Sequence, residues 1–351
     1  MTGEMQSEED KNQTDGGTTM DGRNKINGKL TRREFIAGTA ALAAAGMAGG
    51  KLRAEGSRFH AIPTSPLPTR RFGKTGAKVP LLTFGSGSRW VQYDTDTALK
   101  VMNEAIDSGV FYLDSAHGYG NGKSEERIGM LMPARRKEVL IQTKIMSRGP
   151  DQFRKDLELS LKRLNVDYVD SLLMHSMQHE DDLEAVEKKG GTLEQLYRAK
   201  EEGLARWVGA SSHTNSLVLA TLLGRHELDV VQMALNVATN NARDMGFEEN
   251  ALPMAVERDM GIIAMKVMGQ DQIVGKYDKF DYATCLRYCL SLPISSATVG
   301  MPQPEHLPQN IEVVRNFKPY SDSEREKIKA DAAGEIKTSF AEFMAGHRDT
   351  A

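Results

Sequence analysis

The chain has few cysteines, little surplus charge and no long apolar run, and each scarcity excludes a class of protein. Two cysteines, Cys285 and Cys289, are too few for a disulfide framework or a structural zinc site, and their spacing on one predicted helix suits buried free thiols. The 45 basic and 48 acidic residues leave a net charge of -3, which attracts neither nucleic acid nor an acidic membrane. The most apolar stretch, residues 37–50, falls short of the about twenty residues that a stable membrane span needs.

The first 54 residues are predicted to stand apart from the folded domain. Residues 1–30 are polar and lack apolar periodicity, which is typical of disorder. The pair Arg32-Arg33 precedes a stretch of small and apolar residues, an order typical of a secretion signal that resembles the twin-arginine type. We expect a periplasmic or otherwise exported protein that uses the twin-arginine export machinery, with a Pro/Ser/Thr linker over residues 55–69. A chance Arg-Arg pair in a cytoplasmic protein is the alternative.

From residue 70 onward, strand-like and helix-like segments alternate. Residues 110–114 and 139–144 are apolar runs that end on polar side chains, whereas residues 96–108 carry apolar side chains at helical spacing. Alternation at about thirty residues implies parallel strands with right-handed crossovers.

Eight such units suit a (β/α)8 TIM barrel of the α/β class, which we place over residues 70–320. We expect a short hairpin before the barrel and a helical tail over residues 321–351. A doubly wound sheet is the alternative, but Gly85-Ser86-Gly87 lacks the third glycine of a dinucleotide-binding turn.

Four polar residues are predicted to meet at one mouth of this barrel. Asp114, Lys144 and His175 end three successive strands, and Tyr119 lies in the loop after the first of them. A lysine that closes a buried strand needs a partner such as Asp114, and its ammonium lowers the pKa of a nearby tyrosine from about 10. A neutral His175 can donate to the same substrate oxygen. The set can protonate an alkoxide but supplies no nucleophile or metal cage, so the hydride must come from a cofactor.

At these residues the chain resembles the aldo-keto reductase family, over about residues 70–317. The resemblance is carried by RRFGKTGAKVP, LDSAHGYGNGKSEERIG, IQTKI, DYVDSLLMH, VGASSH, DVVQ and VGMPQPEHLPQN. It implies a barrel enzyme that uses NADP or NAD to reduce a carbonyl, or to oxidise the matching alcohol, in a small or sugar-like molecule. It also implies that Tyr119 is the general acid, that Lys144 and Asp114 tune it, and that His175 orients the substrate.

The resemblance further implies a nucleotide site with several departures from the family pattern. The implied residues are Ser211, Ser212, Gln232, Met265, Lys266, Gly300, His306 and Asn310. Ser212 and Met265 stand where the family commonly has Asn and Tyr. Gly300 and His306 occupy the usual Lys and Arg positions, and a mostly neutral histidine suits a 2'-phosphate less well than an arginine fork. We therefore expect NADP or NAD without choosing between them.

The walls of the substrate pocket are predicted to include Trp90, His117 and Met146. Two other functions are open at this point. A metal-dependent hydrolase or isomerase would use His117, His175 and His213, and a non-catalytic barrel would bind nucleotide as a regulatory subunit. We predict no metal site, and a solvated excursion over residues 177–191.

Overall fold

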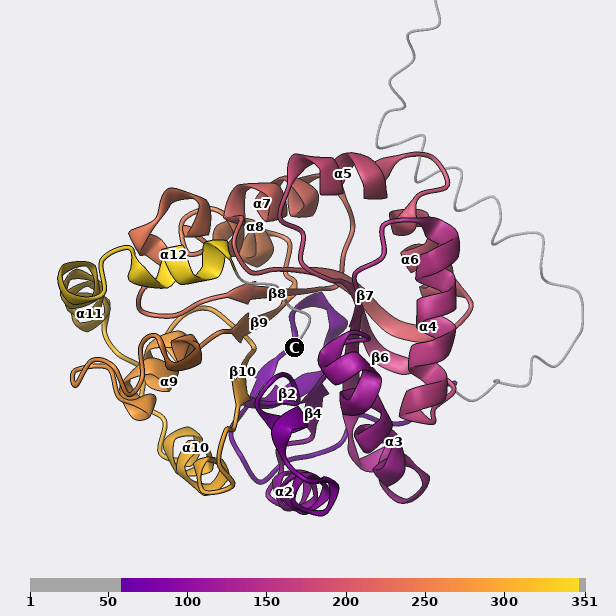
Figure 1. The fold of residues 1–351 in the computed structure, drawn as a ribbon, viewed down its shortest axis with the longest axis horizontal. Helices are drawn as coiled ribbons and strands as arrows, with labels where there is room; N and C mark the ends of the chain where they lie inside the picture. Colours follow the sequence, from indigo (N-terminus) through magenta and orange to yellow (C-terminus); the bar gives the residue numbers. More distant parts are fainter. Residues whose placement is uncertain (1–57, 347–351) are drawn as a thin grey trace, which may run out of the picture. The chain divides into compact units, whose positions relative to one another are not determined.

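The computed structural model describes residues 58–346, which form a closed barrel of eight parallel strands (Figure 1). The predicted leader and signal, and residues 347–351, lie outside the described residues. The barrel strands are β3 (Leu82–Gly85), β4 (Tyr112–Asp114), β5 (Leu140–Ile145), β6 (Val169–Met174), β7 (Ala205–Ser212), β8 (Val230–Ala234), β9 (Gly261–Met265) and β10 (Ser296–Gly300). They follow one another around the barrel in chain order, and β10 closes it against β3. The predicted (β/α)8 class is confirmed.

Helices connect the strands and cover the outside of the barrel (Figure 1). They are α2 (Thr95–Asp107), α3 (Lys123–Arg135), α4 (Pro150–Leu164), α5 (Glu180–Glu187), α6 (Thr192–Glu201), α7 (Ser216–Arg225), α8 (Ala251–Glu257), α9 (Tyr282–Leu290) and α10 (His306–Arg315). Helix α2 illustrates why they form here: Asp94 caps its first turn by accepting from the Thr97 amide. Its residues Ala98, Val101 and Met102 are buried, as their spacing predicts.

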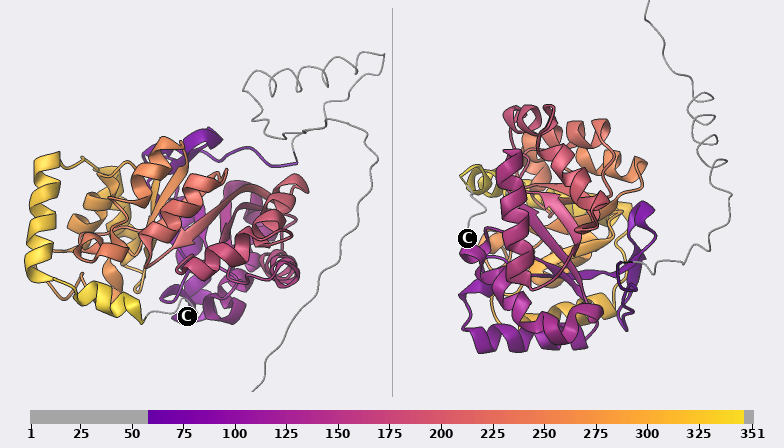
Figure 2. Two further views of the ribbon diagram at one scale, coloured as in Figure 1. Left: turned by 90° about the horizontal axis from the view of Figure 1, so that it is seen from above. Right: turned by 90° about the vertical axis from the view of Figure 1, so that its right-hand side faces the viewer.

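A short hairpin lies across one end of the barrel (Figure 2). It consists of β1 (Thr69–Arg71) and β2 (Lys78–Pro80), paired antiparallel. Phe72 follows β1 and packs edge-on against Tyr112 and Trp207, at ring distances of 5.6 and 5.5 Å. These apolar side chains fill the end of the barrel at which the strands begin. A polar site is therefore expected at the other end, where the strands finish.

Two helices, α11 (Asp322–Glu335) and α12 (Ser339–Ala345), form the predicted helical C-terminal region. Figure 1 shows them, in yellow, on the side of the barrel that also carries α9. Their buried apolar side chains, including Ile336, Phe340 and Met344, pack into the hydrophobic core. The charged segment 177–191, expected to be a solvated excursion, contains helix α5, which buries Leu183 and Val186.

Helix α9 carries both cysteines as buried free thiols, as predicted. Burial raises the pKa of Cys285 to about 12 and the pKa of Cys289 well above its ordinary value, so both stay protonated at neutral pH. Among residues 58–346, no helix combines the length and apolar character that crossing a membrane requires.

Candidate active site

Three neighbouring strands deliver charged or polar side chains to one end of the barrel. Asp114 is the last residue of β4, Lys144 lies near the end of β5, and His175 directly follows β6. Tyr119 lies in the loop after β4 and begins the short turn Tyr119–Gly122, in which Gly120 adopts a φ of 58° that favours glycine. Parallel strands therefore bring together Asp114, Lys144 and His175, which are far apart in the sequence, and the loop after β4 adds Tyr119.

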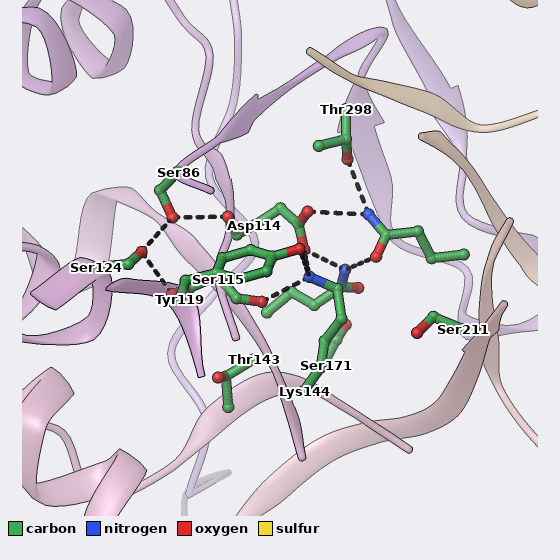
Figure 3. A network of polar contacts seen from close by, with 12 residues as sticks. Ser86, Asp114, Ser115, Tyr119, Ser124, Thr143, Lys144, Ser171, Ser211 and Thr298 are labelled. Carbon is green, nitrogen blue, oxygen red and sulfur yellow. Dashed lines mark hydrogen bonds and ion pairs between the residues drawn. The ribbon is translucent and has the colours of Figure 1, made fainter. Parts of the chain in front are cut away.

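Lys144 contacts both Asp114 and Tyr119, as Figure 3 shows. Its Nζ lies 2.7 Å from Asp114 Oδ1, 2.7 Å from the Ser115 carbonyl oxygen and 3.3 Å from the Tyr119 hydroxyl. An ammonium has three N–H donors, so each has one acceptor here. The side chains of Lys144 and Asp114 are 0% and 4% exposed, and a charge buried to this degree is tolerated only when it is paired.

His175 stands on another side of the Tyr119 ring. The two rings lie 5.9 Å apart in an edge-to-face arrangement, and the His175 side chain is buried. The ring of His213, which follows β7, lies 5.7 Å from the ring of His175. Of these three side chains, Tyr119 and His213 line the cavity described next. The role of His175 in orienting a substrate stays a prediction.

A cavity of about 350 Å³ opens beside these residues, within the size range of cofactor and ligand sites. Asp114, Tyr119 and His213 line it, together with loops after β3, β9 and β10 and the start of α10. Among the predicted nucleotide contacts, the cavity lining contains Met265, Lys266, Gly300, His306 and Asn310.

The other three predicted nucleotide contacts are fully buried in the barrel wall or interior. Ser211 Oγ accepts from the Ser176 amide at 3.0 Å. Ser212 Oγ donates to the Asn215 carbonyl at 3.1 Å, in the turn before α7. The amide of Gln232 donates to Asp114 Oδ2 at 3.0 Å. Their part in nucleotide binding stays a prediction.

The cavity lining suits a dinucleotide. Among residues 58–346, no donor reaches the buried side-chain oxygen of Asn310, which lies on α10 in the lining. Lys266 brings a cation to the same cavity. Its φ of 58° lies in the left-handed region, which is costly for a residue other than glycine and is often found at functional sites. A cation suits the phosphates of a nucleotide, and an amide oxygen without a donor suits an amine group.

None of the three residues predicted for the pocket walls lines this cavity, and their part in a substrate pocket stays a prediction. Trp90 is fully buried, donates to the Ala98 carbonyl at 3.1 Å and packs on Phe84. His117 turns toward α4, where its Nδ1 lies 3.0 Å from Ser160 Oγ. Met146, in the loop after β5, is 42% exposed. The described cavity lining includes none of the three, because a position after a strand does not fix where a side chain points.

Other cavity residues were not predicted from the sequence. Arg89, after β3, forms an ion pair with Asp271, after β9, and both line the cavity. Nothing in the sequence pairs two charges that are so far apart in the chain. The sequence suggests a role for His213 only as a metal ligand, whereas the structure places it in the cavity lining. The described residues contain no cluster of three or more His, Cys, Asp or Glu side chains that could hold a metal ion.

Comparison with known proteins agrees with the barrel fold. The profile of the Aldo/keto reductase family matches residues 82–284. A probable voltage-gated potassium channel subunit beta from Arabidopsis thaliana is 28% identical over 239 residues, which span 63% of this chain and 70% of that protein. The L-glyceraldehyde 3-phosphate reductase of Escherichia coli O157:H7 is 27% identical over 228 residues, or 59% of this chain and 63% of that protein.

Among solved structures, an aldo-keto reductase from Bacillus halodurans shares the fold. Its TM-score is 0.64 at 21% identity, and the match covers 75% of this chain and 96% of that one. The family profile covers more than half of this chain, including Asp114, Tyr119, Lys144 and His175. The chain belongs to the aldo/keto reductase family.

Proposed function

We propose that this NAD(P)-dependent oxidoreductase reduces the carbonyl of a small aldehyde or ketone, with Tyr119 as the proton donor. The observation that carries the proposal is the position of Lys144 Nζ, which is shared between the Asp114 carboxylate and the Tyr119 hydroxyl. A cation at this distance favours the phenolate that forms when the hydroxyl gives up its proton. The same arrangement lets the phenolate take a proton back when the matching alcohol is oxidised.

We infer the roles of the residues from their positions. The substrate carbonyl oxygen lies between the Tyr119 hydroxyl and the imidazole of His175, which donates a hydrogen bond and fixes the carbonyl plane. As negative charge grows on that oxygen, the Tyr119 proton moves to it, and Lys144 stabilises the phenolate left behind. Asp114 balances the charge of Lys144 in a region that excludes water.

The bound nicotinamide nucleotide supplies the hydride in this reaction. Met265 would pack against the nucleotide through its polarisable sulfur, and Lys266 would meet its phosphates. Asn310 would accept a hydrogen bond from an amine donor, because its buried side-chain oxygen is otherwise without a donor among the described residues. Gly300 and His306 provide no fixed cation for a 2'-phosphate, so the choice between NADP and NAD is open to measurement.

A parallel scan of carbonyl and alcohol substrates with NADPH and NADH tests the proposed function. We expect turnover of aldehydes, ketones or sugar-like hydroxycarbonyls with at least one nucleotide. Stoichiometric nucleotide binding without turnover of any carbonyl would instead indicate a non-catalytic nucleotide-binding protein.

We also propose export through the twin-arginine machinery to the periplasm. The support is the Arg32-Arg33 pair ahead of a short run of small and apolar residues. That route carries folded proteins, so the enzyme would bind its nucleotide before export. Replacement of both arginines by lysine should retain the protein in the cytoplasmic fraction, and unchanged fractionation would contradict the proposal.

A further inference from the structure

The carboxylate of Asp114 is held by two buried glutamine amides as well as by Lys144. Gln142 Nε2 donates to Asp114 Oδ1 at 2.6 Å, and Gln232 Nε2 donates to Asp114 Oδ2 at 3.0 Å. Both glutamines are fully buried inside the barrel, on β5 and β8. Each oxygen of the carboxylate therefore has an amide donor in addition to any contact with Lys144.

The orientation of the two amides is fixed by their other hydrogen bonds. Gln142 Oε1 accepts from the Tyr112 hydroxyl at 3.1 Å, and Gln142 Nε2 also donates to Gln232 Oε1 at 3.2 Å. Gln232 Nε2 donates a second time, to Thr298 Oγ1 at 3.1 Å. A flipped amide would turn its oxygen toward the carboxylate, which can only accept, so this arrangement holds both N–H groups on Asp114.

We propose that Gln142 and Gln232 are positioning residues that hold the Asp114 carboxylate against Lys144 and so control proton transfer at Tyr119. We call this pair of residues the amide clamp. The inference rests on the proposed function, because it assigns the clamp to the proton donor of that reaction. Gln232 is also a predicted nucleotide contact; its oxygen accepts from Gln142, and its amide nitrogen donates to Asp114 and Thr298.

The clamp acts on Tyr119 through charge. The two amide donors share the negative charge of Asp114 and hold its carboxylate in one orientation. Lys144 therefore needs only one N–H for Asp114 and keeps another for the Tyr119 hydroxyl. A second carboxylate in place of an amide adds negative charge to the same buried cluster. That charge opposes formation of the phenolate, which then forms at higher pH.

The test compares Gln142→Glu and Gln232→Glu with the neutral, similar-sized variants Gln142→Met and Gln232→Met. The control is Thr83→Val, because Thr83 shares a buried hydrogen bond with Ser296 at 2.6 Å on other barrel strands and does not touch Asp114. In each protein, Tyr119 ionisation is read from phenolate absorbance against pH, after subtraction of the same variant carrying Tyr119→Phe. The pH profile of kcat and the Kd for NADPH and NADH are measured alongside.

We expect phenolate formation and the kcat profile to move to higher pH by about one unit in both Glu variants. We expect kcat at neutral pH to fall on the order of tenfold in both Met variants, with the nucleotide Kd of Gln142→Met within about twofold of wild type. Thr83→Val should titrate like the wild type.

Wild-type titration and kcat in all four glutamine variants would overturn the clamp. So would a Gln232 variant that weakens nucleotide binding without moving the titration, since that result assigns Gln232 to the cofactor. A wild-type enzyme inactive on every carbonyl would defeat the proposed function instead. In that case the phenolate titration, which needs no turnover, still decides whether the clamp controls Tyr119.

Discussion

The ammonium of Lys144 lies 3.3 Å from the hydroxyl of Tyr119 and 4.8 Å from the centre of its ring. This contact joins a side chain that is fully buried in the barrel to one that lines the cavity. The proposed proton donor therefore depends on a residue that does not itself line the cavity.

Replacement of Lys144 by methionine should damage both catalysis and stability. Without the cation the phenolate is no longer favoured, and kcat should fall by about two to four orders of magnitude. Asp114 would also be left as a buried, unpaired charge, which costs about 3–5 kcal/mol of unfolding free energy. Steady-state kinetics and urea unfolding measure the two effects. Lys74→Met is a matched control, because Lys74 pairs with Glu227 at the surface and such pairs contribute at most about 1 kcal/mol.

A methyl group added at Gly87 should disturb the Tyr119 ring. A Cβ built there lies 3.3 Å from Tyr119 Cε2, tighter than an ordinary contact, so the ring must shift by a few tenths of an ångström. Gly87→Ala should lower kcat severalfold and leave the unfolding free energy within about 1 kcal/mol of wild type. Gly118→Ala is the control, because a Cβ there meets nothing within 4 Å. Equal kcat in the two variants would contradict the stated geometry.

The ion pair between Arg89 and Asp271 connects the loops after β3 and β9 beside the cavity. We expect Arg89→Gln to speed nucleotide release, because one connection across the site is lost. The pair is partly exposed, so the change in the dissociation rate should be only about threefold to tenfold. Stopped-flow nucleotide release measures it. The control is Arg71→Gln. Arg71 ends hairpin strand β1 and forms an exposed ion pair with Asp259, so its loss should leave the rate of nucleotide release unchanged.

Acid should loosen the segment before the hairpin through His60. Burial is the main cause that lowers the pKa of His60 in the folded protein, and Arg136 and Arg206 add to the effect. The unfolded chain therefore binds a proton more readily than the folded one, so this contribution to stability is present above about pH 6.5 and is lost as the pH falls below it. Urea unfolding of the wild type and His60→Gln should show a smaller loss on acidification in the variant. Parallel curves would contradict this role.

The barrel and the grouping of residues at its strand ends were easier to predict from the sequence than the direction of loop side chains. Asp114, Lys144 and His175 could be placed together because parallel strands end at the same rim of the barrel and apolar runs mark those ends. Loop side chains follow no such rule. His117 follows a strand end by three residues, yet it turns outward to Ser160 on α4.

The amide clamp escaped prediction for a different reason. Gln142 and Gln232 lie inside apolar strands, and their contact depends on the register that aligns Asp114 with Gln142 across β4 and β5. The spacing of residues along the chain does not predict that Gln142 and Gln232, which are far apart in the sequence, contact each other. A polar residue in the middle of a buried strand was the one available signal, because such a group must find partners inside the barrel.

The most direct test of the account is the Tyr119→Phe variant, which removes one oxygen and keeps the ring. We expect kcat for carbonyl reduction to fall by at least about three orders of magnitude, because no proton is then available to the substrate oxygen. The Kd for the nicotinamide nucleotide should stay within about twofold of wild type. Retained turnover in Tyr119→Phe would contradict the account.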